Sequence, residues 1–194
     1  MPLRLRVPRN KPQAGGTGLS AVFLVGFMGA GKSSVGRALG KRLNWIFEDL
    51  DDRIEQRQGR SVAEIFSAGG EQEFRRAERA ALREVLEELS RGPARIVALG
   101  GGAFVQKGNA ELLKAARVPS IFLDAPVEEL WRRCQEQAGK DGAHRPLLGN
   151  KDRFCALYGA RHSAYSKASL RVETGRRNVE EIADEIARTL GLPN

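Results

Sequence analysis

The chain has 194 residues, of which 41% are hydrophobic and 29% charged, and this suffices for an α/β domain with a sizeable core. No apolar run approaches the ~20 residues that span a membrane, and no secretory hydrophobic segment follows the basic N-terminus, so we expect a cytoplasmic protein. The two cysteines, Cys134 and Cys155, suggest neither a disulfide framework nor a metal site, and we interpret them as inert thiols.

The formal net charge of +8 is concentrated partly at the N-terminus, where residues 1–19 carry cations and no acid. Prolines and glycines are also frequent there, so we interpret residues 1–19 as a flexible basic tail. A basic tail can touch nucleic acid. Because no recognition helix or aromatic platform accompanies it, we expect no nucleic-acid partner.

The first predicted strand, 21–26, and the first predicted helix, 34–43, flank the segment Gly26–Ser33, which matches the pattern G-x-x-x-x-G-K-[ST]. Glycines let such a loop turn its backbone N–H groups inward, and the following helix directs its positive end at the same point. Lys32 can reach the β- and γ-phosphates of a nucleoside triphosphate, and the Ser33 hydroxyl can bind Mg²⁺. A glycine-rich turn that binds nothing is the alternative, and the flanking strand and helix speak against it.

Strands and helices alternate along the rest of the chain, which favours a parallel sheet covered by helices on both faces. Further strands are predicted at 45–48, 94–99, 118–124 and 170–173. Helices are predicted at 52–58, 61–70, 71–90, 111–117, 126–135, 152–168 and 179–190. We therefore predict an α/β three-layer sandwich with a five-stranded parallel sheet, forming one domain over 20–194. Polar, glycine-containing residues at about 135–150 interrupt the helical pattern and predict a mobile lid.

Three candidate groups follow predicted strands, at the sheet edge where ligands bind in α/β proteins. They are the loop Gly26–Ser33, the pair Asp49 and Asp51, and the triple glycine Gly100–Gly102. In an extended chain the two aspartates point to the same side, which suits one carboxylate near Mg²⁺ and one that activates an acceptor hydroxyl. Alternatively, Asp51 or Asp52 only caps the following helix. The glycines allow a ligand close to backbone N–H groups, or form a plain tight turn.

Individual arginines indicate the function less clearly than these three groups do. Arg75 lies near the start of a long helix, where a cation opposes the helix dipole. A functional arginine explains this placement, but from the residues alone a surface ion pair with Glu78 is the favoured interpretation. Arg145, in the predicted lid, is either an arginine that stabilises a transferring phosphoryl group or a solvated loop charge. Arg161 by itself indicates nothing.

Together these segments resemble the shikimate kinase family over about residues 20–192. The segments that carry the resemblance are Gly26–Ser33, Phe47–Asp51, Gly70–Arg76, Leu99–Ala103, Arg145–Leu148, and Arg161 before Tyr165. The phosphate loop alone fits many enzymes, whereas the other motifs in this order are far more specific. The resemblance implies a P-loop kinase that transfers the γ-phosphate of ATP to the 3-hydroxyl of shikimate in aromatic amino acid biosynthesis. We expect a monomer.

The resemblance also implies roles for residues that would contact shikimate. Asp51 would hold the acceptor hydroxyls, and Arg75 and Arg161 would clamp the shikimate carboxylate. Two arginines suit a carboxylate because each guanidinium offers a bidentate fork. Gly101 and Gly102 would add backbone contacts to the same substrate. The resemblance thus reverses the interpretation of Arg75 as a surface ion pair.

For the nucleotide, the resemblance implies that Lys32 and Arg145 neutralise the transferring phosphoryl group. Arg133 would lie on the adenine, and Asp49 would support Mg²⁺ together with Ser33. The residues expected to contact ATP are Gly29, Ala30, Gly31, Lys32, Ser33, Ser34, Arg133 and Arg145.

The chain departs from the family pattern in places. Ser34 stands where Thr is usual, Val179 replaces a proline often found near the adenine, and the predicted lid is longer than in many relatives. A kinase for gluconate or a nucleoside monophosphate is a second hypothesis, because a phosphate would also attract arginines. A catalytically silent metabolite-binding module is a third, but such a protein would be expected to lose Lys32, an aspartate or Arg145, and all are present.

Overall fold

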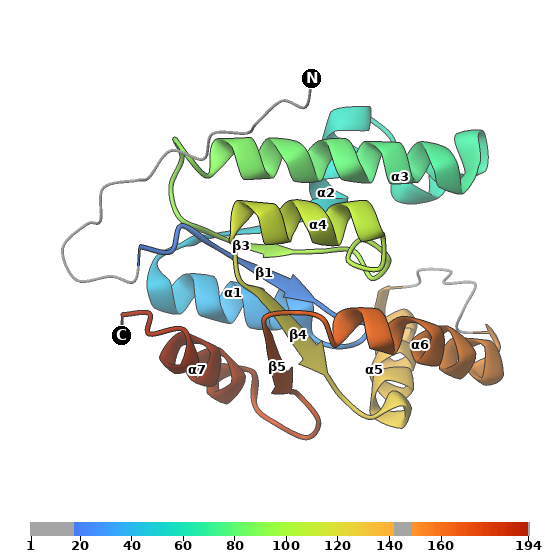
Figure 1. Cartoon of the computed structure of the whole chain (residues 1–194). Helices are drawn as coiled ribbons and strands as arrows, with labels where there is room; N and C mark the ends of the chain where they lie inside the picture. The colour runs from blue at the N-terminus through green and yellow to red at the C-terminus, as the bar shows by residue number, and fades with distance from the viewer. Residues whose placement is uncertain (1–17, 142–148, 194) are drawn as a thin grey trace.

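The computed structural model describes residues 18–141 and 149–193 and contains a five-stranded parallel sheet with the strand order β2-β3-β1-β4-β5 (Figure 1). This confirms the predicted fold class. Each strand lies within two residues of its predicted position. The strands are β1 Ala21–Val25, β2 Ile46–Asp49, β3 Arg95–Ala98, β4 Ser120–Asp124 and β5 Leu170–Glu173.

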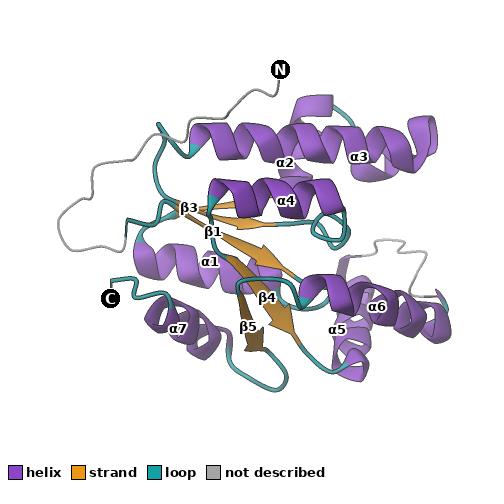
Figure 2. Ribbon diagram, in the orientation of Figure 1, coloured by secondary structure: helices purple, strands orange, loops and turns teal. Residues whose placement is uncertain are grey.

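Helices cover both faces of the sheet (Figure 2). The helices are α1 Lys32–Leu43, α2 Leu50–Gln58, α3 Val62–Glu88, α4 Lys107–Ala116, α5 Val127–Asp141, α6 Lys151–Tyr165 and α7 Val179–Thr189. Helices α1 and α7 lie together on one face, and α3 and α4 lie on the other (Figure 1). None of the helices in the described ranges is long and apolar enough to cross a membrane.

The central strand β1 pairs with β3 on one side and β4 on the other. After β1 the chain enters α1 on one face of the sheet, whereas after β3 it enters α4 on the opposite face (Figure 1). Neighbouring strands whose connections leave in opposite directions open a crevice at their carboxyl ends. The phosphate loop follows β1 and the triple glycine follows β3, so this topology brings both to one crevice.

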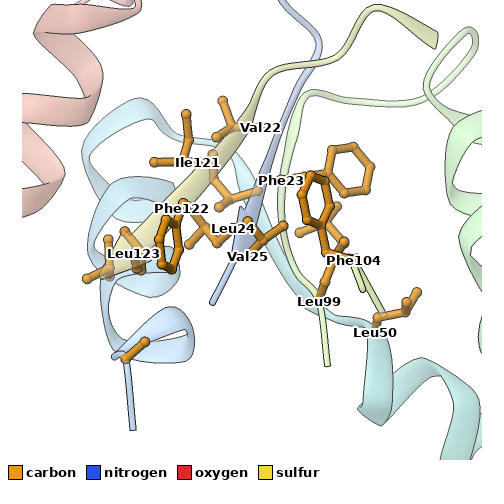
Figure 3. Packing of buried hydrophobic residues seen from close by; sticks show 14 of the residues in the cluster. Val22, Phe23, Leu24, Val25, Leu50, Leu99, Phe104, Ile121, Phe122 and Leu123 are labelled. Atoms are coloured by element: carbon orange, nitrogen blue, oxygen red, sulfur yellow. The ribbon is translucent and has the colours of Figure 1, made fainter. Parts of the chain in front are cut away.

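The core lies between the sheet and its helices (Figure 3). Every residue of β1 and β4 is buried, as expected for central strands of a parallel sheet covered on both faces. Leu50, Leu99 and Phe104 extend the packing toward the carboxyl ends of β2 and β3. The loops that follow these strands therefore start from a close-packed base, which limits their movement.

Helix α3 combines the two helices predicted at 61–70 and 71–90. Its start is a capping box, in which the Ser61 hydroxyl accepts from the Glu64 N–H and the Glu64 carboxylate accepts from the Ser61 N–H. The helix is interrupted at Gly70, whose φ of 69° and ψ of −170° are not helical. The residues after Gly70 thus begin a second helical segment, in agreement with the helix predicted at 71–90.

Two predicted helix boundaries are wrong by four or more residues. Helix α4 begins at Lys107 rather than 111, with Gln106 as its N-cap, and the buried Asn109 side chain in its first turn donates to the Ala103 carbonyl oxygen at 3.1 Å. Helix α5 continues to Asp141 rather than ending near 135. The added residues are mostly good helix formers, and a single glycine costs only about 1 kcal/mol within a helix. The predicted lid at 135–150 is therefore helical over its first part.

Other predicted features fall in residues that the structure does not describe. The remainder of the predicted lid, 142–148, includes Arg145, and the predicted tail falls almost wholly within residues 1–17.

Candidate functional site

A cleft of about 510 Å³ lies at the carboxyl ends of β1, β2 and β3. It brings together most of the residues predicted from the sequence to contact ligands, although they come from five regions of the chain. The predicted residues that line it are Gly29, Gly31, Lys32, Ser33, Ser34, Asp49, Asp51, Arg75, Gly101, Gly102 and Arg161.

The loop after β1 presents its backbone to this cleft. Gly29 and Gly31 have φ values of 77° and 88°, which side-chain-bearing residues rarely adopt, so these positions require glycine. Gly31 is also the N-cap of α1, and neither a capping side chain nor an acidic residue occupies the first turn of the helix. The first N–H groups and the positive end of α1 are thus available to an anion, as a phosphate site needs.

The Lys32 side chain curls back along the loop. Its Nζ donates to the carbonyl oxygens of Gly26 and Phe27, each at 3.0 Å, and so stabilises the closed turn while lining the cleft. Ala30 is buried beneath the loop, and its carbonyl oxygen accepts from the Thr174 hydroxyl at 3.4 Å. Ala30 can therefore contact a ligand only through its backbone.

Asp49 connects this loop to helix α2. Its Oδ2 accepts from the Ser33 hydroxyl at 3.1 Å, and its Oδ1 accepts from the Asp51 N–H at 3.1 Å, which caps α2. The capping carboxylate is thus Asp49, and the alternative that Asp51 or Asp52 serves as the cap is wrong. The reason is that β2 extends to Asp49, so α2 begins two residues earlier than predicted.

Ser33 and Asp49 supply the cleft with an adjacent hydroxyl and carboxylate, which are the hard oxygen donors that Mg²⁺ prefers. Among the described residues, no group of three or more His, Cys, Asp or Glu side chains could hold a metal ion. Mg²⁺ in kinases is usually held by one or two side chains together with phosphates and water. The residues present therefore fit Mg²⁺ that arrives with a nucleotide.

Asp51 lies at the base of the cleft. Its Oδ1 is buried and has no hydrogen-bond partner in the part of the chain that the structure describes. Burial and the negative charge of Asp49 raise the pKa of Asp51 to about 6, although the positive charge of Lys32 acts in the opposite direction. An unpartnered buried carboxylate is costly, so this atom is one that a bound ligand hydroxyl would satisfy.

The three glycines after β3 differ in how closely other groups of the protein approach them. A Cβ on Gly100 would lie 2.6 Å from Asp51 Oδ1, and a Cβ on Gly102 would lie 2.5 Å from Arg75 Nη2. Gly101 has more room, because its nearest neighbour would be the Met28 nitrogen at 3.8 Å. Gly100 and Gly102 thus let Asp51 and Arg75 pack directly on the backbone, whereas Gly101 leaves open space.

Arg75 reaches the cleft from α3 and is held by two carboxylates. Its Nη1 donates to Glu78 at 2.9 Å, while Nε and Nη2 both donate to Glu71 at 3.2 Å. The predicted pair with Glu78 therefore exists, but it is not a surface pair, because the Glu78 side chain is only 1% exposed. Burial raises the pKa of Glu78 to about 7, against the lowering effect of Arg75.

Arg161 enters from the opposite side, on α6. Its guanidinium lies 6.0 Å from the centre of the Phe27 ring, and its Nη1 donates to the Gly101 carbonyl oxygen at 3.4 Å. The same carbonyl oxygen accepts from the Tyr165 hydroxyl. The glycine loop therefore lies between Arg75 and Arg161, so the two predicted carboxylate-binding arginines face one region of the cleft.

Arg133 does not line the cleft but lies behind the phosphate loop. It donates to Glu129 at 2.8 Å, to the Gly29 carbonyl oxygen at 3.5 Å and to the Thr174 carbonyl oxygen at 2.7 Å. These contacts join α5, the phosphate loop and the segment after β5. Arg133 thus lies beside Gly29 of the phosphate loop, and its contact with the adenine stays a prediction.

Comparisons with known proteins agree with this arrangement. The family model for shikimate kinase matches residues 28–191. The chain belongs to the shikimate kinase family. Shikimate kinase from Cereibacter sphaeroides is 39% identical over 172 residues, which cover 87% of this chain and 81% of the relative. Shikimate kinase from Geobacter sulfurreducens is 41% identical over 169 residues, covering 86% and 88%.

A solved structure extends the likeness to three dimensions. Shikimate kinase from Acinetobacter baumannii in complex with shikimate superposes with a TM-score of 0.77 at 31% identity, covering 89% of this chain and 93% of that chain. Family membership confirms the resemblance found in the motifs. It also agrees with the cleft, which joins a phosphate loop to a pair of arginines.

Sequence reasoning missed several residues that shape this shikimate kinase cleft. Phe66 and Phe74 stack with ring centroids 4.6 Å apart and form an apolar wall with Val62. Phe74 is buried on the apolar face of α3. Glu78 was considered only as a surface partner, although it lies four residues after Phe74 and thus on the same, apolar face of α3. A carboxylate on that face was the available signal for its burial.

Proposed function

We propose that this chain is an ATP-dependent kinase that transfers the γ-phosphate of ATP to the 3-hydroxyl of shikimate, giving shikimate 3-phosphate and ADP. The observation that carries the proposal is the position of Asp51. Its unpartnered carboxylate oxygen lies in the same cleft as the phosphate loop on one side and the pair Arg75 and Arg161 on the other. Such a cleft can hold a phosphate donor and an acidic alcohol at the same time.

On the acceptor side, Arg75 and Arg161 bind the carboxylate of shikimate through charge-assisted hydrogen bonds. The apolar wall of Phe66 and Phe74 packs against the carbon ring, and the open space over Gly101 receives it. Asp51 accepts the hydrogen of the 3-hydroxyl, so that the oxygen attacks the γ-phosphorus. The proton passes to Asp51 as the bond from this phosphorus to the β-phosphate oxygen breaks.

On the donor side, the N–H groups of the loop and the start of α1 hold the phosphates, with Lys32 moving from its loop carbonyls to the β- and γ-phosphates. Ser33 and Asp49 would hold Mg²⁺, which neutralises phosphate charge when bound. Arg133 contacts the adenine in this proposal. Arg145, which lies outside the described residues, completes it as the arginine that stabilises the transferred phosphoryl group.

The acceptor is tested by measuring ADP release from ATP and Mg²⁺ with shikimate, gluconate or a nucleoside monophosphate as the second substrate. The proposal predicts turnover that depends on shikimate, with the other acceptors at background. Preference for gluconate or the monophosphate would make the protein a kinase of another acceptor. Absence of turnover with all three, together with measurable shikimate binding, would identify a silent binding module and overturn the proposal.

The proposal includes a monomeric, cytoplasmic enzyme of aromatic amino acid biosynthesis with no nucleic-acid partner. Light scattering of the purified full-length protein tests the monomer, for which a mass near 21.3 kDa is expected.

A further inference from the structure

All three nitrogens of the Arg75 guanidinium donate to protein carboxylates. Glu71 Oε1 accepts from both Nε and Nη2, and Glu78 Oε1 accepts from Nη1. The two carboxylates differ greatly in exposure, since the Glu71 side chain is 68% exposed and the Glu78 side chain is 1% exposed. Glu78 is also tied down from its other side, because Asn109 Nδ2 donates to its Oε2 at 3.4 Å.

Charge balance indicates what must happen when an acidic substrate binds. Arg75 carries one positive charge and already contacts two carboxylates, those of Glu71 and the buried Glu78. A substrate carboxylate would be the third one around Arg75, and it binds through N–H groups on the same three nitrogens. Of the two protein carboxylates, only Glu71 can turn out into water at little cost, because it already lies at the surface.

We propose that Glu71 acts as an internal carboxylate that occupies Arg75 in the empty enzyme and is displaced by the substrate carboxylate. This inference rests on the proposed function, because it takes Arg75 to be a substrate-binding residue. Glu71 thereby keeps the arginine extended toward the cleft and sets the affinity for the acidic substrate. A substrate without a carboxylate does not displace Glu71, so only acidic substrates bear the cost of this displacement.

A purely structural role for Glu71 leads to different expectations. Glu71 directly follows the interruption at Gly70, so it lies at the N-terminus of the second segment of α3, where an acid stabilises a helix. If that were its only function, replacing it would lower the melting temperature without changing substrate affinity.

The test measures shikimate binding by calorimetry, and kcat and KM in the ADP-release assay, for the full-length protein and the variants Glu71→Gln and Glu71→Ala. An exposed ion pair is worth little, so we expect Kd and KM for shikimate to fall by about two- to fivefold. We expect kcat to stay within about twofold. The gain should shrink at high salt, which screens the exposed pair in the wild type.

Glu111→Gln is the matched control. Glu111 is 65% exposed and pairs with Lys107 one helical turn away, as Glu71 pairs with Arg75, but it does not line the cleft. This variant should leave Kd for shikimate unchanged. The methyl ester of shikimate is the matched ligand, and its weaker binding should not improve in Glu71→Gln because it lacks the displacing carboxylate.

An unchanged or weakened affinity for shikimate in both Glu71 variants would overturn the inference. This result differs from a failure of the proposed function. If Arg75 did not bind the substrate, Arg75→Ala would leave KM for shikimate unchanged as well. If only the Glu71 inference is wrong, Arg75→Ala still raises KM while the Glu71 variants do not lower it.

Discussion

The two halves of the cleft are built in different ways. The nucleotide half is one continuous stretch, Gly26–Ser33, that acts through backbone N–H groups and a helix N-terminus. The acceptor half is assembled from side chains on α2, α3 and α6 around the loop after β3, with Asp51, Arg75 and Arg161 as its charged groups. A backbone cradle serves any nucleotide, whereas side chains from separate elements define one acceptor. Changes to the two halves should therefore affect different constants.

Asp51→Asn is expected to give the largest difference between the effect on turnover and the effect on nucleotide binding. The amide cannot take the proton of the acceptor hydroxyl, so kcat should fall by about 10²- to 10⁴-fold. The dissociation constant of ADP, measured by calorimetry, should stay within about twofold because the phosphate loop is untouched. A collapse of ADP affinity would show that the two halves are not separable and that Asp51 has another role.

Gly100 and Gly102, in the loop after β3, allow the roles of Asp51 and Arg75 within the acceptor half to be tested separately. In Gly100→Ala the new methyl group collides with Asp51, so kcat should fall by tenfold or more, since small misplacements of reacting groups are costly, up to about 10²-fold. In Gly102→Ala the collision is with Arg75, so KM for shikimate should rise by about tenfold with kcat less affected. Steady-state kinetics of both variants tests this, and the same pattern in both would contradict it.

The pH dependence of stability provides a third test of the acceptor half. Asp51 has a pKa near 6 in the folded protein and about 3.9 in the unfolded chain. Below about pH 4 both states are protonated, so ionisation of Asp51 has no effect on the free energy of unfolding. Between pH 4 and 6 the unfolded chain loses its proton first, so stability falls with rising pH, and above pH 6 the full loss persists.

Asp51→Asn removes this cost and should raise the free energy of unfolding by about 1–3 kcal/mol at pH 7.5 and by little at pH 4. Denaturant titration at the two pH values measures it. In the wild type, kcat/KM for shikimate should fall as pH drops below about 6, because the protonated carboxyl cannot act as a base. If Asp51→Asn were less stable than the wild type at pH 7.5, this would contradict the claim that the ionised Asp51 carboxylate destabilises the fold.

The smallest effect is expected from Tyr165→Phe. It removes the hydrogen bond from the Tyr165 hydroxyl to the Gly101 carbonyl oxygen, which helps to hold the glycine loop beside Arg161. The loss should cost about 0.5–1.5 kcal/mol of stability and raise KM for shikimate by a few-fold at most. Thermal unfolding and kinetics of the single variant measure both, and a change in ADP affinity would be unexpected.

The difference between the two halves of the cleft also explains which parts of the structure could be predicted from the sequence alone. The phosphate loop is contiguous, so its motif and flanking elements predicted its structure, and the alternation of strands and helices predicted the sheet. The acceptor half depends on contacts between residues far apart in the chain, such as Gly102 with Arg75. The resemblance to shikimate kinases predicted that these residues bind one substrate, but it did not predict their contacts with one another.

Burial was the main quantity that the sequence did not predict. Glu78 lies on the apolar face of α3, and its carboxylate is buried there because Arg75 and Asn109 satisfy its oxygens. The length predicted for α5 was also too short. The last residues of this helix are mostly polar, so a hydrophobicity pattern does not distinguish them from a loop, although most of them favour the helical conformation. The cap of α2 was misplaced because it depends on where β2 ends, which composition does not define.

The most direct test of the account is to identify the product of the purified protein by ³¹P NMR after incubation with ATP, Mg²⁺ and shikimate. Transfer through this cleft predicts ADP and a phosphate monoester of shikimate in equal amounts, with the phosphate coupled to the proton on carbon 3. Release of inorganic phosphate without the ester, or an ester at another hydroxyl, would contradict the assignment of Asp51 and of the arginine pair.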